Sequence, residues 1–100
     1  MTIYEANTTL TVSGGSGNSI TLRIPGGIAN YLLIRSNTAS TVFRADLTDE
    51  DSIRRLNYDF HEGEIVDDKL NFPITGKYTI NVTNASPNDT FRIILAVKEQ

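Results

Sequence analysis

The sequence predicts an all-β protein, an antiparallel β-sandwich or jelly roll of about seven to nine short strands. Apolar and polar residues alternate with a period of two in several segments, most clearly over residues 77–83 and 91–97. These segments are rich in β-branched and aromatic residues, and turn-forming residues separate them about every ten positions. One hundred residues suffice for one hydrophobic core, so we expect a single β-sandwich domain over residues 1–100.

The first third of the chain predicts two strands joined by a glycine-rich loop. Residues 8–12 alternate, and residues 13–18 contain three glycines and two serines. Residues 20–24 alternate again and are followed by Pro25-Gly26-Gly27, where we expect the second strand to stop. The simplest pairing of these two strands is a β-hairpin around the glycine-rich loop.

The next two strands differ in how many of their faces are apolar. Residues 31–34 are apolar at every position, as in a strand that is buried on both faces or is contacted by a neighbour on its second face. A turn is expected over residues 36–40. The strand at residues 42–47 places Phe43, Ala45 and Leu47 on one face and ends in the acidic turn 48–52.

The segment at residues 53–60 fits two periods. Ile53, Leu56 and Phe60 fit a helical stripe, whereas Leu56, Tyr58 and Phe60 fit one face of a strand. The aromatic content favours a strand, with a helical turn as the alternative. Residues 61–64 are expected to turn the chain, and residues 70–74 to form a strand whose proline indicates a strand end or an edge.

The last quarter of the chain is the clearest segment, and the rest of the fold is expected to cover it. Residues 77–83 and 91–97 alternate on either side of the polar turn 84–89. We expect a β-hairpin with one buried face. The residues of that face are Tyr78, Ile80, Val82, Phe91, Ile93, Leu95 and Val97.

Composition excludes several functional classes. The chain is 39% hydrophobic and 21% charged, has no cysteine and carries a net charge of −3, so we expect no nucleic-acid partner. The first residues contain neither a basic nor an apolar segment of the signal-peptide kind, and no run is long enough to span a membrane. We therefore expect no signal peptide and no membrane partner.

The charges are distributed unevenly along the chain. Residues 46–68 hold nine acidic and two basic side chains, a net charge of −7, and the remainder holds three acidic and seven basic ones, a net charge of +4. One interpretation is a solvated acidic loop region. The other is a molecule with one acidic and one basic end, which suits head-to-tail packing of identical copies.

Residues for catalysis are scarce. His61 is the single histidine and lies in a turn-like segment, which is typical of an ordinary surface residue. The Gly15-Ser16-Gly17 segment is neither a nucleophile elbow nor a phosphate-binding loop, because no strand-to-helix transition and no lysine follow it. We expect no enzyme activity, no catalytic residues, no cofactor and no small-molecule substrate.

The acidic turn raises the question of a metal. Four carboxylates occur within residues 46–51, and calcium prefers oxygen ligands in such a turn. The spacing does not match an EF-hand loop, and acidic clusters without a ligand pattern are mostly solvated. We predict no metal site and leave calcium binding by this turn as the alternative.

A contact surface is indicated by apolar residues at positions where alternation predicts polar ones. Ile94 and Ala96 lie between the buried positions of the last strand, and Leu32 and Ile34 belong to the strand that is apolar on both sides. Apolar side chains left on an outer face are typical of protein interfaces. The candidate interface residues are Leu32, Ile34, Ile94 and Ala96.

Part of the sequence resembles the pre-peptidase C-terminal domains of bacteria. The similar segments are residues 43–51, residues 76–84, which open with Gly76-Lys77-Tyr78, and residues 90–93. The resemblance implies a β-sandwich with an acidic turn after one strand. In that family the turn carries a glycine, where this chain has Ser52. The function implied is a small protein- or carbohydrate-binding module.

Most of the chain, from the N-terminal strand through Ser13-Gly14-Gly15 and residues 47–51 to the last two strands, resembles small stand-alone virion proteins of tailed bacteriophages. This resemblance implies a non-enzymatic structural protein of a phage particle, a capsid decoration or head accessory protein. The partners implied are the major capsid protein, another virion protein or further copies of the chain, in a homo-oligomer. The location implied is the virion, after assembly in the host cytoplasm.

Overall fold

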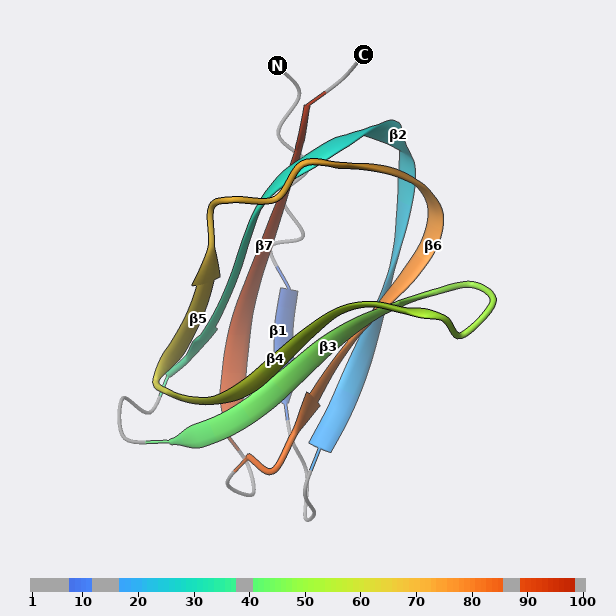
Figure 1. Ribbon diagram of the computed structural model, residues 1–100. Helices are drawn as coiled ribbons and strands as arrows, with labels where there is room; N and C mark the ends of the chain where they lie inside the picture. Colours follow the sequence, from blue (N-terminus) through green and yellow to red (C-terminus); the bar gives the residue numbers. More distant parts are fainter. Residues whose placement is uncertain (1–7, 12–16, 38–40, 86–88, 99–100) are drawn as a thin grey trace.

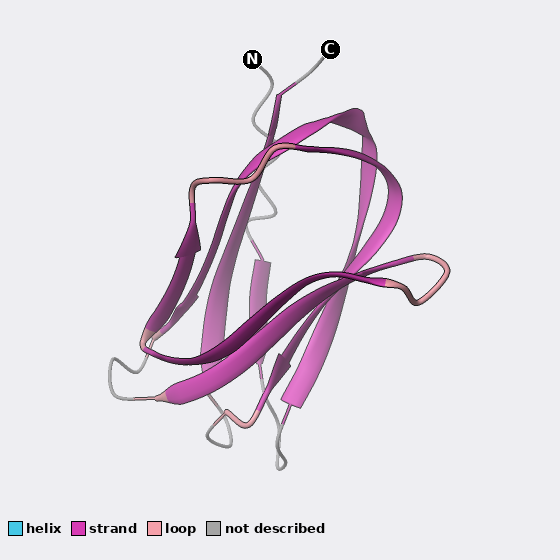
Figure 2. Ribbon diagram, in the orientation of Figure 1, coloured by secondary structure: helices cyan, strands magenta, loops and turns pink. Residues whose placement is uncertain are grey.

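The computed structural model describes residues 8–11, 17–37, 41–85 and 89–98. These residues form seven strands and no helix (Figure 2). The strands are β1 (Thr8–Thr11), β2 (Gly17–Ser36), β3 (Val42–Asp49), β4 (Arg54–Glu62), β5 (Glu64–Asp67), β6 (Phe72–Thr83) and β7 (Thr90–Lys98). In the described part of the chain no helix has the length and apolar character that crossing a membrane requires.

All strand pairs are antiparallel, and the long strand β2 connects two sheets (Figure 1). Residues 17–24 of β2 pair with β6, which pairs with β3, which pairs with β4; we call this the first sheet. Residues 28–36 of β2 pair with β7, which pairs with β1, and residues 32–35 also pair with β5; we call this the second sheet. The fold class predicted from the sequence is confirmed.

The core lies between the two sheets. Alternating residues of β3 and β6 in the first sheet and of β7 and β2 in the second sheet are almost completely buried. Phe43 of β3 contacts Phe91 of β7 with ring centroids 4.8 Å apart. These two strands are separated by β6 and β2 in the sheet order, so the contact requires the sheets to face each other.

The predicted hairpin of the last quarter is wrong in its pairing and right in its buried face. The side chains predicted to share that face are all buried, with exposures of 8% or less. However, β6 pairs with β2 and β3, whereas β7 pairs with β1 and β2. The two strands therefore lie in different sheets and contribute to the core from opposite sides.

The hairpin predicted around the glycine-rich segment is also wrong. β1 pairs with β7, and the start of β2 pairs with β6. Residues 12–16 lie outside the described residues, and Gly17 and Asn18 belong to β2.

The predicted end of the second strand at Pro25-Gly26-Gly27 is replaced by a bend. β2 continues through it, and the ladder to β6 shifts register between Ile24 and Gly27. Gly26 and Gly27 have φ angles of 134° and 147°, which residues with a side chain rarely adopt. The glycines therefore turn one strand from the first sheet into the second instead of ending it.

The segment predicted at residues 53–60 is a strand from Arg54 onward, and the helical alternative is wrong. Leu56 and Tyr58 pack against the core as half-buried side chains, but Phe60 lies outside it and is 55% exposed. Two irregularities in the pairing with β3 change which residues of β4 face the core. The chain turns at Gly63, inside the turn predicted at residues 61–64, and the strand β5 continues over residues 65–67, for which no element was predicted. β6 runs unbroken through Pro73 and Gly76, where separate strands were predicted.

Candidate functional site

The outer face of the second sheet carries a row of apolar side chains across three strands. Leu33 of β2 lies opposite Val66 of β5 on one side and opposite Ile94 of β7 on the other. Their chain neighbours, among them Ile34, Ile65 and Ile93, point into the core, so the residues of the row point outward. Val66 is 50% exposed, Ile94 is partly exposed, and Leu33 in the middle of the row is 6% exposed.

A second pair extends this row, and charged side chains border it. Tyr31 lies opposite Ala96, and both are partly exposed. Two residues beyond Leu33 along β2, Arg35 lies opposite Glu64 of β5 and Arg92 of β7. Its Nε is 3.1 Å from Glu64 Oε2. We call the five residues Tyr31, Leu33, Val66, Ile94 and Ala96 the apolar row. An apolar centre with a charged border is the arrangement of a protein interface.

The predicted interface residues fall on two different sides of the second sheet. Ile94 and Ala96 belong to the apolar row. Leu32 and Ile34 are each 1% exposed and belong to the core, so no partner reaches their side chains in this fold. The residues of β2 that do face outward are their neighbours Tyr31 and Leu33.

Sequence reasoning missed the rest of the apolar row for two reasons. A strand that is apolar at every position gives no signal for which alternate set faces the core. Val66 was missed because the segment Glu64–Asp67 was not predicted to be a strand. The sequence Glu64-Ile65-Val66-Asp67 has two adjacent apolar residues and no alternation, so it gave no signal that Ile65, 1% exposed, faces the core and Val66, 50% exposed, faces outward.

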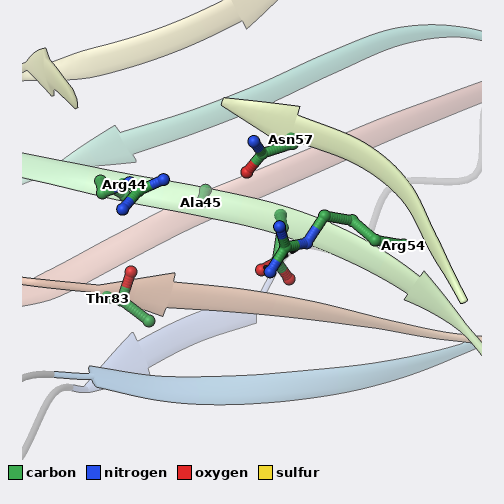
Figure 3. Close-up of a pocket in the computed structure, with 6 residues that line it drawn as sticks. Arg44, Ala45, Arg54, Asn57 and Thr83 are labelled. Carbon is green, nitrogen blue, oxygen red and sulfur yellow. Dashed lines mark ion pairs between the residues drawn. The ribbon is translucent and has the colours of Figure 1, made fainter. Parts of the chain in front are cut away.

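The outer face of the first sheet is polar and contains a small depression of about 140 Å³. Figure 3 shows Arg44, Arg54, Asn57 and Thr83 around it, from β3, β4 and β6. Asp46 also lines it and accepts a hydrogen bond of 2.6 Å from Asn81 Nδ2, and its other carboxylate oxygen lies 3.5 Å from Arg54 Nε. Ligand pockets typically measure about 300–1,000 Å³, so this depression suits a few water molecules.

Arg44 shows why the exposed Phe60 is not an open aromatic surface. One of the pairing irregularities sets both Asp59 and Phe60 opposite Arg44. The Arg44 guanidinium lies 5.4 Å from the centre of the Phe60 ring, and its Nε lies 3.6 Å from Asp59 Oδ1. The cation therefore covers one face of the ring, in the geometry of a cation–π contact.

The acidic turn between β3 and β4 is organised by Asp49. Its Oδ1 accepts hydrogen bonds of 2.9 Å from the amides of Asp51 and Ile53, and its Oδ2 lies 2.8 Å from Arg55 Nη2. The hydrogen bond from the Ile53 amide, with those from Arg55 and Asp51, lowers the pKa of Asp49 below its ordinary value of 3.8. This carboxylate holds the turn.

The predicted acidic cluster is divided by the fold. Asp46 points to the outer face of the first sheet, toward Asn81 and Arg54, and Asp49 points into the turn. In the described stretches of the chain no three acidic, histidine or cysteine side chains are arranged to hold a metal ion. The alternative of a calcium site in this turn is therefore given no support by the geometry.

The two remaining polar groups of interest both make contacts within the fold. His61 is exposed, and its Nδ1 lies 2.7 Å from the carbonyl oxygen of Asp59. Tyr58 donates a hydrogen bond of 2.8 Å from its hydroxyl to Asp67 Oδ2, which connects β4 to β5. Burial, together with this carboxylate, raises the pKa of Tyr58 above its ordinary value of 10.0. Among the described residues, neither the His61 ring nor the Tyr58 hydroxyl is hydrogen-bonded to a serine or threonine hydroxyl.

Comparison with known proteins gives no family for this chain. No protein-family model matches it, and a search of curated proteins found no match.

Proposed function

We propose that this chain is a non-enzymatic structural protein that binds other proteins through the apolar row of its second sheet. In this proposal it is a capsid decoration or head accessory protein of a tailed phage, and it acts in the virion. Its partner is the major capsid protein, another virion protein or a further copy of the chain.

The observation that supports a binding role is the apolar row itself. Val66 of β5 is 50% exposed, and the row continues through the partly exposed Tyr31 of β2 to the partly exposed Ile94 and Ala96 of β7. Removing apolar surface from water contributes about 25 cal/mol per Å², so a partner that covers this row gains free energy from it. The charged border formed by Arg35, Glu64 and Arg92 supplies the directional contacts that fix how the partner is oriented.

Assignment to a phage particle rests on the resemblance of the sequence to small virion proteins. The shape is compatible with that role, because the described part of the chain measures 39 × 25 × 21 Å and exposes one strand-rich face that is apolar at its centre. A decoration protein needs such a face for the shell.

The second candidate is a protein- or carbohydrate-binding module of the pre-peptidase C-terminal type. The apolar row supports protein binding by such a module equally well. Sugar recognition generally uses an open aromatic ring, but Arg44 lies over Phe60, and Tyr31 is only partly exposed. Binding to a glycan array would favour this second candidate over the first.

Mass spectrometry of purified particles of the phage whose genome encodes this chain tests the first candidate. We expect the chain in the particles, and its absence would contradict the virion role. In a particle-binding assay we expect Val66→Asp to lose binding, because it places a charge in the apolar row. Thr21→Asp is the matched control on the outer face of the first sheet and is expected to bind normally.

A further inference from the structure

The strand β4 is an edge of the first sheet. It pairs with β3 on one side, and no strand in the described ranges of the chain pairs with its other side. β5 follows it directly after Gly63 but pairs with β2. A free strand edge presents unpaired N–H and C=O groups and is a template for another strand.

β4 is a long edge strand, and most of its side chains are exposed to solvent. It spans nine residues, seven of which are exposed, and Leu56 and Tyr58 are the partly buried ones. Many proteins keep their edges short to prevent pairing, as β1 and β5 are here with four residues each. β4 is more than twice as long as either of those two edge strands.

The sequence of β4 is complementary to itself when it is read in the opposite direction. We propose that β4 pairs antiparallel with β4 of a second copy, about a twofold axis at Tyr58. In this register Arg54 lies opposite the partner's Glu62, and Glu62 lies opposite the partner's Arg54. Opposite charges across a strand pair are favourable, and a twofold axis makes each such contact twice.

The two irregularities in the pairing of β4 with β3 keep Arg54 and Glu62 on the same face of the sheet, as this register requires. One lies on each side of Tyr58, opposite the Phe43/Ala45 step and the Leu47/Thr48 step of β3. Arg54 lies opposite Thr48, and Glu62 lies opposite Val42. Phe43, Ala45 and Leu47 point into the core, so Thr48 and Val42, which alternate with them, both point outward. Arg54 and Glu62 therefore project from the same face of the sheet and can meet across the axis.

Both charged groups are accessible. The Arg54 side chain is 58% exposed, and its Nε lies 3.5 Å from Asp46 Oδ2, which leaves its remaining N–H groups for a second carboxylate. Glu62 is exposed and makes no ion pair within the described residues. This charge pattern selects a second copy of the chain over an unrelated strand.

The dimer that results joins two first sheets edge to edge and leaves both apolar rows uncovered. The contact is therefore different from the one proposed for the shell or another binding partner. Its readout is self-association of the purified chain, which does not depend on whether the chain occurs in virions.

Charge reversal tests the pairing. Sedimentation equilibrium of the full chain is expected to show a species of twice the 11.0 kDa chain mass. Arg54→Glu or Glu62→Arg alone should raise the dissociation constant about tenfold, because each creates two like-charge contacts. The combined Arg54→Glu/Glu62→Arg variant should dimerise more tightly than either single variant, because it restores opposite charges across the axis, although Glu at position 54 then faces Asp46 of its own copy. Lys77→Glu, which makes the same change in net charge at an exposed position of β6 away from the β4 edge, is the control and should have no effect.

A monomer at all concentrations, or a combined variant no tighter than the single ones, would overturn the proposal. Crosslinking gives an independent test, because the chain has no cysteine. Under mild oxidation Tyr58→Cys should form a disulfide-linked dimer across the axis, where antiparallel Cα atoms lie about 4.5–5.5 Å apart. Thr79→Cys, on the outer face of the first sheet, should remain monomeric. Crosslinking of Thr79→Cys instead would indicate face-to-face packing and contradict edge pairing.

Discussion

The ring of Phe43 on β3 meets the ring of Phe91 on β7 edge-on, with the ring planes inclined by 66° and the centroids 4.8 Å apart. Both side chains are 0% exposed. Since β3 and β7 belong to different sheets, this pair joins the two layers at the centre of the core. Edge-to-face aromatic pairs contribute beyond the apolar area that they bury.

We expect Phe43→Leu and Phe91→Leu each to lower the free energy of unfolding, since both remove buried ring atoms. The double variant should be less destabilised than the sum of the two single ones, with a coupling of about 0.5–1.5 kcal/mol. Urea denaturation of the four proteins provides this double-mutant cycle. A coupling of zero would show that the two rings contribute by burial alone.

The sequence predicted the buried faces well and the strand partners poorly. Alternation determines which side of a strand is apolar, and the buried residues of β3, β6 and β7 follow it. Alternation carries no information about which strand lies alongside. For β6 and β7, turn residues between two alternating segments predict a hairpin, although the same residues also connect two sheets.

The candidate interface was predicted in part, for a related reason. Ile94 and Ala96 interrupt a clear alternation, so their outward direction could be read from the sequence. Leu32 and Ile34 lie in a strand whose two faces are both apolar, and only the register with β7 and β5 shows that Leu33 faces outward. Val66 became part of the site only through the pairing of β5 with β2.

Gly27 is required by a close approach of the backbone. A Cβ atom at this position would lie 2.5 Å from the carbonyl oxygen of Lys98 and 2.7 Å from Val97 Cγ1. We expect Gly27→Ala to lower the free energy of unfolding by more than about 1 kcal/mol, because its φ of 147° and this clash are both unfavourable. Thermal unfolding followed by circular dichroism measures the effect.

Gly26→Ala is the matched control for that variant. Gly26 also has a positive φ, of 134°, but a Cβ there would approach no closer than 3.6 Å, to Thr75 Oγ1. Gly26→Ala should therefore be destabilising through backbone strain alone, and by less than Gly27→Ala. Equal effects of the two variants would show that the contact with Lys98 is relieved by a small shift of β7.

Ser52 occupies a conformation that favours glycine. Its φ is 63°, and it lies within the turn that Asp49 organises, since its own amide donates to the Asp49 carbonyl oxygen. The left-handed region costs a residue with a side chain about 1–2 kcal/mol, and glycine is more flexible in the unfolded chain by about 0.5–1 kcal/mol. We expect Ser52→Gly to raise the free energy of unfolding by up to about 1 kcal/mol in urea denaturation. A smaller gain is expected from Asn84→Gly, because asparagine tolerates its φ of 59°.

The hydrogen bonds of Asp49 give the stability of the protein a dependence on acid pH. The amide of Ile53 is the main cause that lowers the pKa of this carboxyl below 3.8, and Arg55 and the amide of Asp51 add to it. A group whose pKa is lower in the folded state stabilises the fold when it is ionised. Its contribution is therefore complete above the pKa of the unfolded chain and is lost as the pH falls through the lower pKa of the folded protein.

We expect Asp49→Asn to be less stable than the wild type at pH 6, because the amide loses the ion pair with Arg55. The difference in the free energy of unfolding should shrink as the pH falls below 3.8, the ordinary pKa of this carboxyl, because the contribution of the ionised group is lost as the pH falls through the lower pKa of the folded protein. Urea denaturation at each pH measures both proteins. Asp68→Asn controls for the change in net charge, because Asp68 is exposed and makes no hydrogen bond or ion pair in the described part of the chain. A difference between wild type and Asp49→Asn that stays constant down to pH 3 would show that the turn is held without the charge of Asp49.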